Sequence, residues 1–223
     1  MTITPEQKQL LSQHLSLVIE ANKTTNITRI ADGEQGWLLH VEDSLVGVPE
    51  VDEAPAGKLA DLGSGAGYPG IPLAVVTDRR VTLVESVGKK AALLEGFAKD
   101  LGLQNTVDVF AGRAEELARQ RHGQYAVITA RALSSLPSLM ELASPLLIQG
   151  GRLVCYKSVD IEDELVAAKR VQKVLAMRLV GKRDTVLQDG KTPRSIVVFE
   201  KTGKPLVKLP RREGLAQRKP YKN

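Results

Sequence analysis

A glycine-rich run at residues 61–70 is the part of the sequence whose residue types point most directly to chemistry. It reads DLGSGAGYPG and follows an apolar segment at 58–62 that we expect to form a strand. Glycines at positions 63, 65 and 67 let the backbone turn sharply and approach a ligand without an intervening side chain. In open α/β sheets, ligands bind beyond the carboxyl ends of such strands. The run therefore predicts a ligand-binding loop.

Two kinds of ligand remain open for this loop. A dinucleotide fingerprint beginning at Gly63 needs glycine or alanine at position 68, where this chain has Tyr68. With Asp61 before it, the loop instead resembles the first motif of S-adenosylmethionine-dependent methyltransferases, whose glycines contact the amino-acid part of the cofactor. A tight β–α turn without a ligand would show the same glycines, so the loop alone does not decide the function.

Acidic residues follow the next two predicted strands. Glu85 ends the second strand, 22 positions after Gly63, where a carboxylate can accept hydrogen bonds from both ribose hydroxyls. Ala114 and Glu115 follow the third strand, at the edge that usually contacts adenine through a backbone amide and an acidic side chain. A solvated glutamate explains Glu85 equally well on spacing alone. Glu115 would also suit a helix N-terminus.

The residues at the end of the fourth predicted strand restrict the kind of group that the protein could methylate. Many amino-methylating enzymes place Asn/Asp-Pro-Pro-Tyr/Phe there, whereas this chain has TARALS at 129–134. Methylation of an exocyclic amine therefore loses support. Arg131 at this edge can meet a carboxylate or a phosphate, or it can form a surface ion pair.

Strands and helices must alternate to bring these residues to one edge. The apolar pattern predicts strands at 58–62, 81–85, 106–110, 125–130 and 152–156, and two β-like runs at 177–187 and 195–200. Helices are predicted at 5–21, 37–45, 69–76, around 93–97, and at 114–119, 139–147 and 161–175, with a linker at 49–57. This α/β alternation predicts a parallel sheet covered on both faces, with a terminal antiparallel pair.

Charge and composition restrict the class of protein. The 223 residues carry a net charge of +5, and the tail at 201–223 holds eight Lys/Arg against one acid. A basic tail favours a polyanionic partner, most simply nucleic acid, although a solvated terminus looks the same. The lone Cys155 excludes an intrachain disulfide and cysteine-based zinc patterns, so no metal is expected. Without an apolar span or a secretory signal, a cytoplasmic protein without membrane contact is expected.

These segments together resemble the RsmG (GidB) family of small-subunit rRNA methyltransferases over nearly the whole chain. The shared residues are Asn26-Ile27-Thr28, His40-x-x-Asp43-Ser44, the run at 61–72, Glu85-Ser86-x-x-Lys89-Lys90, Arg113-Ala114-Glu115, Arg131-Ala132, Lys157 and Leu209-Pro210-Arg211-Arg212-x-Gly214. The run Gly-x-Pro-Gly-Ile-Pro at 67–72 is unusual for methyltransferases generally and carries most weight. Tyr68 departs from the usual Leu or Phe, and Ser158 stands where Lys-Gly is common.

The resemblance implies a class I S-adenosylmethionine-dependent methyltransferase (Rossmann-like) fold at 57–200, with an N-terminal helical extension at 1–56 and the basic tail at 201–223. It implies transfer of a methyl group to N7 of a guanine in a decoding-region loop of 16S rRNA. With the spacing above, the cofactor-binding candidates are Gly63, Gly65, Tyr68, Glu85, Ala114, Glu115 and Arg131. The RNA-binding candidates are His40, Lys157, Arg194, Arg211 and Arg212.

No catalytic base is expected, because guanine N7 already has an in-plane lone pair. His14 falls among helix-surface positions and is expected to be structural, and His122 is expected to be exposed. The partner is 16S rRNA or the assembling small subunit, and a monomer is favoured. We expect the tail to strengthen RNA binding without forming the cofactor site.

Two alternatives belong to other classes of protein. A nucleic-acid-binding protein could retain this fold without catalysis, but the intact glycine loop and Glu85 disfavour it. A dinucleotide-dependent oxidoreductase is disfavoured by Tyr68 and by the absence of another substrate domain.

Overall fold

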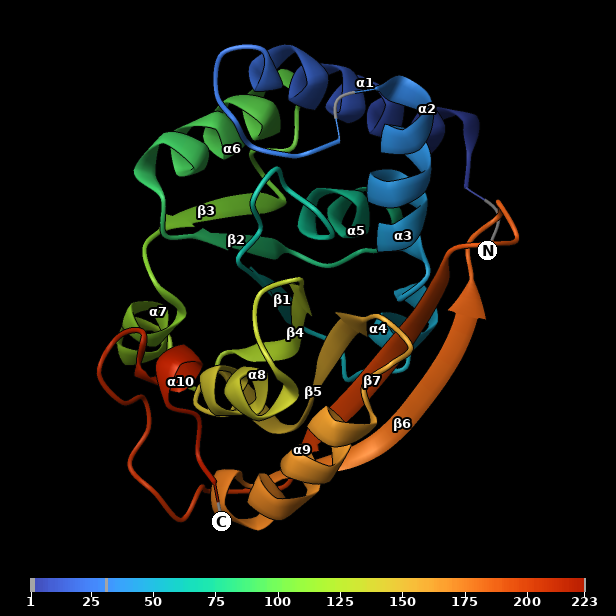
Figure 1. The fold of residues 1–223 in the computed structure, drawn as a ribbon. Helices are drawn as coiled ribbons and strands as arrows, with labels where there is room; N and C mark the ends of the chain where they lie inside the picture. Colours follow the sequence, from blue (N-terminus) through green and yellow to red (C-terminus); the bar gives the residue numbers. More distant parts are fainter. Residues whose placement is uncertain (1–2, 31, 223) are drawn as a thin grey trace.

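Seven strands form the central sheet of the computed structural model (Figure 1). They are β1 (Lys58–Leu62), β2 (Val81–Glu85), β3 (Val107–Ala111), β4 (Tyr125–Arg131), β5 (Leu147–Lys157), β6 (Met177–Val186) and β7 (Pro193–Lys201). They are hydrogen-bonded in the order β3-β2-β1-β4-β5-β7-β6, with β1 to β5 parallel and β7 antiparallel to both β5 and β6. The predicted parallel sheet with a terminal antiparallel pair is confirmed.

The structure describes residues 3–30 and 32–222. Positions 1, 2 and 31 of the predicted N-terminal extension and position 223 of the predicted tail therefore lie outside the described part. Within the described ranges, no helix has both the length and the apolar character that crossing a bilayer requires. The division of the chain at residues 56 and 200 stays a prediction.

Helices cover both faces of the sheet, because successive side chains along a strand point to opposite sides. Leu59 and Val127 face one hydrophobic core, whereas Ala60 and Ile128 face the other. The first core is closed by α1 (Pro5–Asn22), α4 (Val48–Asp52), α5 (Gly70–Val76) and α6 (Gly88–Asp100), and the second by α7 (Ala114–Gln120), α8 (Leu136–Ala143), α9 (Glu162–Leu175) and α10 (Leu215–Arg218).

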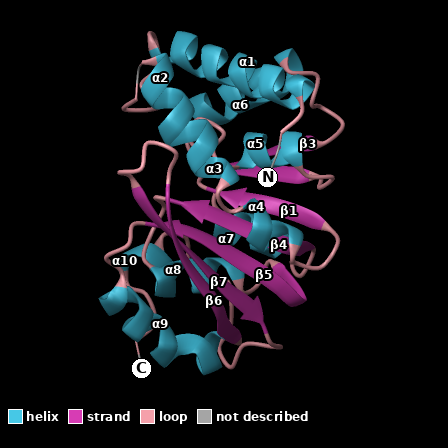
Figure 2. Cartoon of the chain, turned by 90° about the vertical axis from the view of Figure 1, so that its right-hand side faces the viewer, coloured by secondary structure: helices cyan, strands magenta, loops and turns pink. Residues whose placement is uncertain are grey.

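The N-terminal helices lie over the first core, and Figure 2 shows α1 along α6. A capping box fixes the start of α1: Gln7 N donates to Thr4 Oγ1 at 3.2 Å, and Thr4 N donates to Gln7 Oε1 at 2.9 Å. The chain then forms α2 (Gly33–Gly36), the π-helix η1 (Trp37–Glu42) and α3 (Asp43–Leu45). The predicted helix at 37–45 is confirmed and begins earlier, because Asp32 caps the backbone N–H of Gln35 at 2.8 Å.

Two predicted boundaries are wrong. The segment predicted as a linker contains α4, which Pro49 favours in its first turn and which buries Val48 and Val51. The helix predicted at 139–147 is α8, which ends at residue 143, and Leu147 already belongs to β5. In both places the buried apolar residues pack against the sheet, and this tertiary packing decided the element.

The basic tail is folded against the body, although several of its cations remain exposed. In Figure 1 the red C-terminal segment runs past α7 and α8 and includes α10. Arg211 makes an ion pair with Glu141 at 2.5 Å, and the Glu141 side chain is only 2% exposed. Arg119 pairs with Glu213 at 3.0 Å, and Ala216 is buried in the second core. The tail therefore contributes to packing as well as to charge.

Candidate active site

The glycine loop joins β1 to α5 at the carboxyl edge of the sheet. Its start is fixed by the Val84 carbonyl, which accepts hydrogen bonds from the backbone N–H groups of Gly63 at 2.9 Å and Ser64 at 3.1 Å. Gly63 and Gly65 have φ values of +71° and +58°, a conformation that favours glycine. A Cβ on Gly65 would meet only the Gly63 carbonyl at 3.9 Å, so the loop leaves open space there.

Asp61 supports this loop through contacts inside the protein. Its side chain is fully buried, accepts a hydrogen bond from Thr129 Oγ1 at 2.9 Å, and accepts one from Gly70 N at 3.1 Å. Burial raises the pKa of Asp61 to about 6, although both hydrogen bonds favour the charged form. Asp61 thus connects β1, β4 and the start of α5.

A first cavity, which we call the glycine-loop pocket, opens between this loop and the ends of β2 and β3. It is lined by Gly63, Val84, Ser86, Gly112, Arg113, Ala114, Glu115, Leu133, Leu142 and Gln217. Glu85 adjoins it: the Glu85 carboxylate accepts hydrogen bonds from Gly65 N at 3.1 Å and Val87 N at 2.8 Å. The pocket itself combines the glycine backbone with the carboxylate of Glu115, and Glu85 lies between the lining residues Val84 and Ser86.

A second cavity, which we call the arginine pocket, opens on the other side of the end of β4. It is lined by Ile30, Leu39, His40, Asp43, Arg131, Ala132, Tyr156, Lys157, Ser158 and Arg194. Asp43 accepts from Arg131 Nη1 at 2.9 Å through Oδ2 and from Arg194 Nε at 2.7 Å through Oδ1. The Asp43 side chain is 4% exposed, so one buried carboxylate orients both guanidinium groups.

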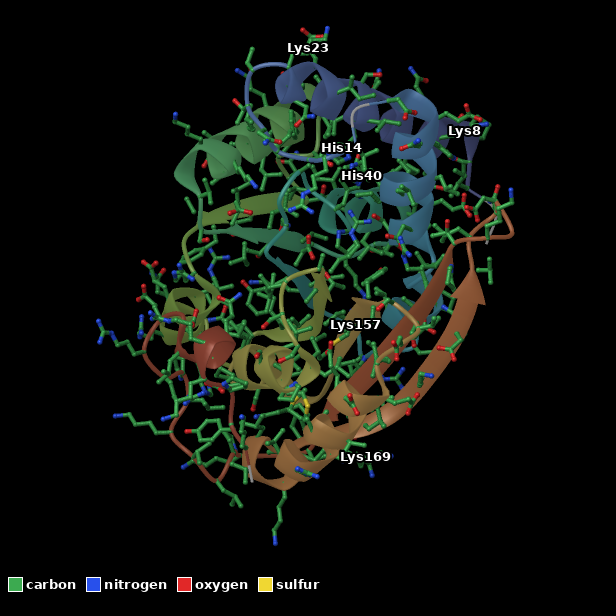
Figure 3. All side chains as sticks on the ribbon, viewed as in Figure 1. Lys8, His14, Lys23, His40, Lys157 and Lys169 are labelled. Atoms are coloured by element: carbon green, nitrogen blue, oxygen red, sulfur yellow. The ribbon has the colours of Figure 1, made fainter. Side chains whose placement is uncertain are left out.

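An aromatic stack lies behind the arginine pocket. The Tyr68 ring lies between those of His14 and His40, with centroid distances of 4.5 Å and 4.6 Å, and Figure 3 shows the two histidines together below α1. Burial lowers the pKa of His14 to about 3 and that of His40 to about 4, so both are neutral at pH 7. The Arg131 guanidinium lies 5.6 Å from the Tyr68 ring centre.

His14 is buried, so its predicted helix-surface position is wrong. It shares a helix face with Leu11, Leu15 and Val18, which are also buried in α1. Its Nε2 is 3.0 Å from the Ala66 carbonyl, which can only accept, so Nε2 carries the proton. The expected structural role is consistent with this contact, because His14 holds the glycine loop against α1.

The predicted cofactor-binding residues divide between the two pockets. Gly63, Ala114 and Glu115 line the glycine-loop pocket, and Gly65 and Glu85 adjoin it. The other two lie elsewhere: Arg131 lines the arginine pocket, and Tyr68 is stacked behind it.

The predicted RNA-binding residues are likewise split. His40, Lys157 and Arg194 line the arginine pocket, whereas Arg211 is occupied by its ion pair with Glu141. Arg212 is exposed on the tail and lines neither pocket.

Asp43, Leu133 and Gln217 are among the lining residues of the two pockets that were not predicted as candidates. Asp43 lies in the sequence segment that begins at His40 and could have been found as its acidic partner. Leu133 follows Arg131 by two positions, so a place near the site could have been inferred. Gln217 carries no local signal, because only the folding of the tail brings it to the glycine-loop pocket.

The chain is similar to known proteins over most of its length. The family model described as rRNA small subunit methyltransferase G matches residues 7–186. A ribosomal RNA small subunit methyltransferase G of Streptococcus agalactiae serotype V is 32% identical over 225 residues, covering 99% of this chain and 94% of that protein. One from Synechococcus elongatus is 34% identical, covering 97% and 91%.

Solved structures show the same fold at low sequence identity. An O-methyltransferase from Bacillus cereus in complex with SAH has a TM-score of 0.59 at 18% identity and covers 85% of this chain and 91% of that chain. A mutant of MtNAS in complex with S-adenosylmethionine has the same TM-score at 18% identity, covering 87% and 73%. The predicted Rossmann-like class I methyltransferase fold is confirmed.

Proposed function

The chain belongs to the rRNA small subunit methyltransferase G family, and we propose that it transfers a methyl group from S-adenosylmethionine to N7 of a guanine in the decoding-region loop of 16S rRNA. The observation that carries this proposal is the arrangement at the end of β4. Arg131 and Ala132 line the arginine pocket, and Leu133 lines the glycine-loop pocket. A methyl donor in one pocket and its acceptor base in the other can therefore lie on the two sides of the backbone turn at 131–133.

Ala132 marks the boundary between the two pockets. Its φ is +53°, a left-handed conformation that is uncommon for residues other than glycine. Such backbone strain is typical of functional sites. The turn sends the side chains on either side of Ala132 into different cavities, which supports a reaction centre at this position.

The glycine-loop pocket fits S-adenosylmethionine, which supplies an activated methyl group on a sulfonium centre. Gly63 and Gly65 allow the backbone to approach the amino-acid part. Glu85 offers a carboxylate to the ribose hydroxyls, and Ala114 and Glu115 offer a backbone amide and a carboxylate to adenine. We assign the arginine pocket to the guanine and its phosphates.

The reaction at guanine N7 needs no proton removal, because this atom carries a free lone pair at neutral pH. Positioning and charge placement can then supply the catalysis. His40 is not available as a base: Nε2 is 2.9 Å from Thr28 Oγ1, and Nδ1 is 3.4 Å from Arg131 Nη2. Because a guanidinium only donates, Nδ1 accepts and the proton resides on Nε2.

Cationic side chains around the arginine pocket supply the RNA contacts. Arg194 donates to Asp43 through Nε and to the Pro193 carbonyl through Nη1, and these bonds leave Nη2 for an RNA oxygen. Lys157 is 2.7 Å from Glu164 and 3.2 Å from the Ser134 carbonyl, so it is held at the rim. Both side chains can meet a phosphate after small movements.

We infer that the partner is 16S rRNA, either free or within the assembling small subunit, and that the protein acts in the cytoplasm. A monomeric state stays a prediction. The test is to map N7-methylguanine in 16S rRNA from cells with and without this protein, using borohydride reduction and aniline cleavage. One site lost on deletion and restored by the wild-type chain is expected. An unchanged map, or loss of a modification other than N7-methylguanine, would contradict the proposal.

A further inference from the structure

The C-terminal segment 213–218 lies against the glycine-loop pocket, beyond the residues 7–186 that the family model matches. Gln217 lines this pocket together with Gly63 and Glu115. The tail therefore reaches the pocket that we propose for the cofactor, although the sequence led us to expect it to be separate from that site. The physical reason is that the tail folds back along α7 and α8, as the red segment of Figure 1 shows.

Packing holds this segment in place. Ala216 is 1% exposed within the second core, and the Glu213 side chain pairs with Arg119 on α7 at 3.0 Å. Arg218 Nε donates to the Gly214 carbonyl at 3.3 Å. A segment fixed by apolar burial, an ion pair and a local hydrogen bond presents Gln217 to the pocket in a defined position.

Glu115 is bonded directly to this segment. Gly214 N donates to Glu115 Oε1 at 2.7 Å, and Glu115 is 5% exposed. This bond orients the carboxylate and leaves its second oxygen for a donor from the ligand. Gly214 has a φ of +70°, and a Cβ there would lie 3.3 Å from Arg218 Nη2. Position 214 thus suits glycine for its backbone conformation.

We propose that segment 213–218 is part of the cofactor site and recognises the adenine ring. The side-chain amide of Gln217 forms hydrogen bonds with the edge of adenine. Gly214 orients the Glu115 carboxylate so that it can accept a hydrogen bond from the exocyclic amine of adenine. Adenine presents one amine donor beside ring-nitrogen acceptors, and a glutamine amide can both donate and accept. This inference rests on the proposed function, since it takes S-adenosylmethionine as the ligand of the glycine-loop pocket.

The first experiment measures binding of S-adenosylhomocysteine to the full chain by calorimetry. Gln217→Ala should weaken binding by about threefold to tenfold, the range of one hydrogen bond between neutral groups. Gln120→Ala is the matched control, because Gln120 is also exposed, ends the neighbouring α7 and does not line the pocket. The control should bind as tightly as the wild type, and all three proteins should unfold at the same temperature without ligand.

The second experiment tests whether adenine is the group recognised. In S-inosylhomocysteine a carbonyl replaces the exocyclic amine of adenine. A carbonyl cannot donate a hydrogen bond, so the Glu115 carboxylate has nothing to accept from at this position. The wild type should bind it at least tenfold more weakly than S-adenosylhomocysteine. Glu115→Gln keeps a carbonyl oxygen for Gly214 and presents an amide donor to the ligand, so it should discriminate less between the two compounds.

Hydrogen exchange supplies a readout that is independent of these variants. Saturating S-adenosylhomocysteine should slow amide exchange in residues 213–218 of the wild type. Unchanged exchange in this segment, equal affinity of Gln217→Ala and wild type, or equal discrimination by Glu115→Gln and wild type would each overturn the inference. A wild-type protein that binds no S-adenosylhomocysteine at all would instead contradict the proposed function.

Discussion

Asp43 and Arg131 form a buried ion pair that joins the N-terminal helices to the end of β4. Asp43 Oδ2 is 2.9 Å from Arg131 Nη1, and the two side chains are 4% and 16% exposed. Arg131 Nη1 also donates to the Leu39 carbonyl at 3.0 Å. Because Ala132 follows at the boundary between the two pockets, this pair fixes the backbone where donor and acceptor should meet.

Replacing Arg131 should therefore damage the reaction more than it damages the fold. Arg131→Ala removes one of two guanidinium partners of Asp43, and Arg194→Ala removes the other. Both variants should lower the free energy of unfolding by about 1–3 kcal/mol, because each leaves a buried carboxylate with one partner. In single-turnover methylation with saturating cofactor, Arg131→Ala should be at least tenfold slower than Arg194→Ala. Equal rates would show that the position beside Ala132 has no special role.

A methyl group at Gly65 should exclude the cofactor without unfolding the protein. The Cβ of Gly65→Ala would point into open space beside the loop, and the φ of +58° costs about 1–2 kcal/mol for alanine. Gly123→Ala is the matched control, since its φ is +61° and a Cβ there meets nothing within 4 Å. Calorimetry with S-adenosylhomocysteine should show a loss of binding only for Gly65→Ala. If both variants bind normally, the open space at Gly65 is not part of the cofactor site.

The sequence predicted the glycine-loop pocket well, because its parts follow successive strands. Gly63, Glu85 and Ala114 each come at or soon after the end of a parallel strand, and parallel strands bring their carboxyl ends to one edge. The same rule placed Arg131 near the site. A regular alternation of elements therefore sufficed to predict both the fold class and this half of the site.

The remaining parts depend on contacts between distant segments. Asp43 contacts Arg194, which is 151 positions away in the sequence, and Glu141 contacts Arg211, which is 70 positions away. No periodicity in the sequence predicts either pair. His14 was different, because the buried face of α1 was visible in Leu11 and Leu15 on either side of it. Its polar character concealed a position that the helical spacing already indicated as buried.

The exposed cations of the tail should strengthen RNA binding without affecting the cofactor. Arg211 and Arg218 are occupied by contacts within the protein. Among residues 208–222, the other cations are Lys208, Arg212, Lys219 and Lys222, and all four are exposed. Changing all four to glutamine should lower RNA affinity and reduce the slope of log K against log salt by about 0.7 for each phosphate that these cations neutralise in the wild type. Filter binding of a 16S rRNA fragment at several salt concentrations measures both quantities.

A control with equal charge loss separates the tail from general charge effects. Lys8, Lys23 and Lys169 are exposed in the N-terminal helix region and on α9, as Figure 3 shows, and Lys173 is also exposed on α9. Glutamine at these four positions should leave the salt slope unchanged. If the two quadruple variants have the same slope, the tail makes no specific RNA contact. Affinity for S-adenosylhomocysteine should remain at the wild-type value in both.

Lys201 should make stability depend on alkaline pH. It is 6% exposed, its Nζ donates to Ser144 Oγ at 2.5 Å, and burial lowers its pKa to about 8. In the unfolded chain the pKa of this lysine is about 10.4. Between about pH 8 and 10.4 the unfolded chain therefore binds more protons than the folded chain, so the free energy of unfolding increases with pH over this interval. Lys201→Met should raise the free energy of unfolding by about 1–3 kcal/mol at pH 7.

Urea unfolding at several pH values checks this assignment. The advantage of Lys201→Met should decrease from pH 8 upward and disappear near pH 10. Lys169→Met serves as the control, because Lys169 is exposed on α9 and the same substitution there removes no buried ammonium group. An advantage of Lys201→Met that is constant from pH 7 to pH 10 would show that the lysine is not neutralised by burial.

The rate of methyl transfer should not depend on a histidine base. His40 has a pKa lowered to about 4 by burial and by the neighbouring Arg131, so it stays neutral from pH 6.5 to 9. Guanine N7 is also unprotonated over this interval. Single-turnover methylation, with saturating cofactor and the small-subunit substrate, should therefore give a flat pH profile. A methylation rate that increases from pH 6.5 to 8 would show that the reaction requires a titrating group that the proposed mechanism does not include.

Because a histidine with so low a pKa would give a flat profile even as a base, the decisive measurement is substitution. His40→Gln keeps a donor for Thr28 Oγ1 but cannot accept a proton at neutral pH. Its single-turnover rate should fall by less than about tenfold, whereas loss of a general base costs about 10²–10⁴-fold. His122→Gln, at an exposed loop position, controls for loss of a histidine elsewhere. A fall of more than a hundredfold for His40→Gln, with unchanged affinity for cofactor and RNA, would show that His40 takes part in proton transfer.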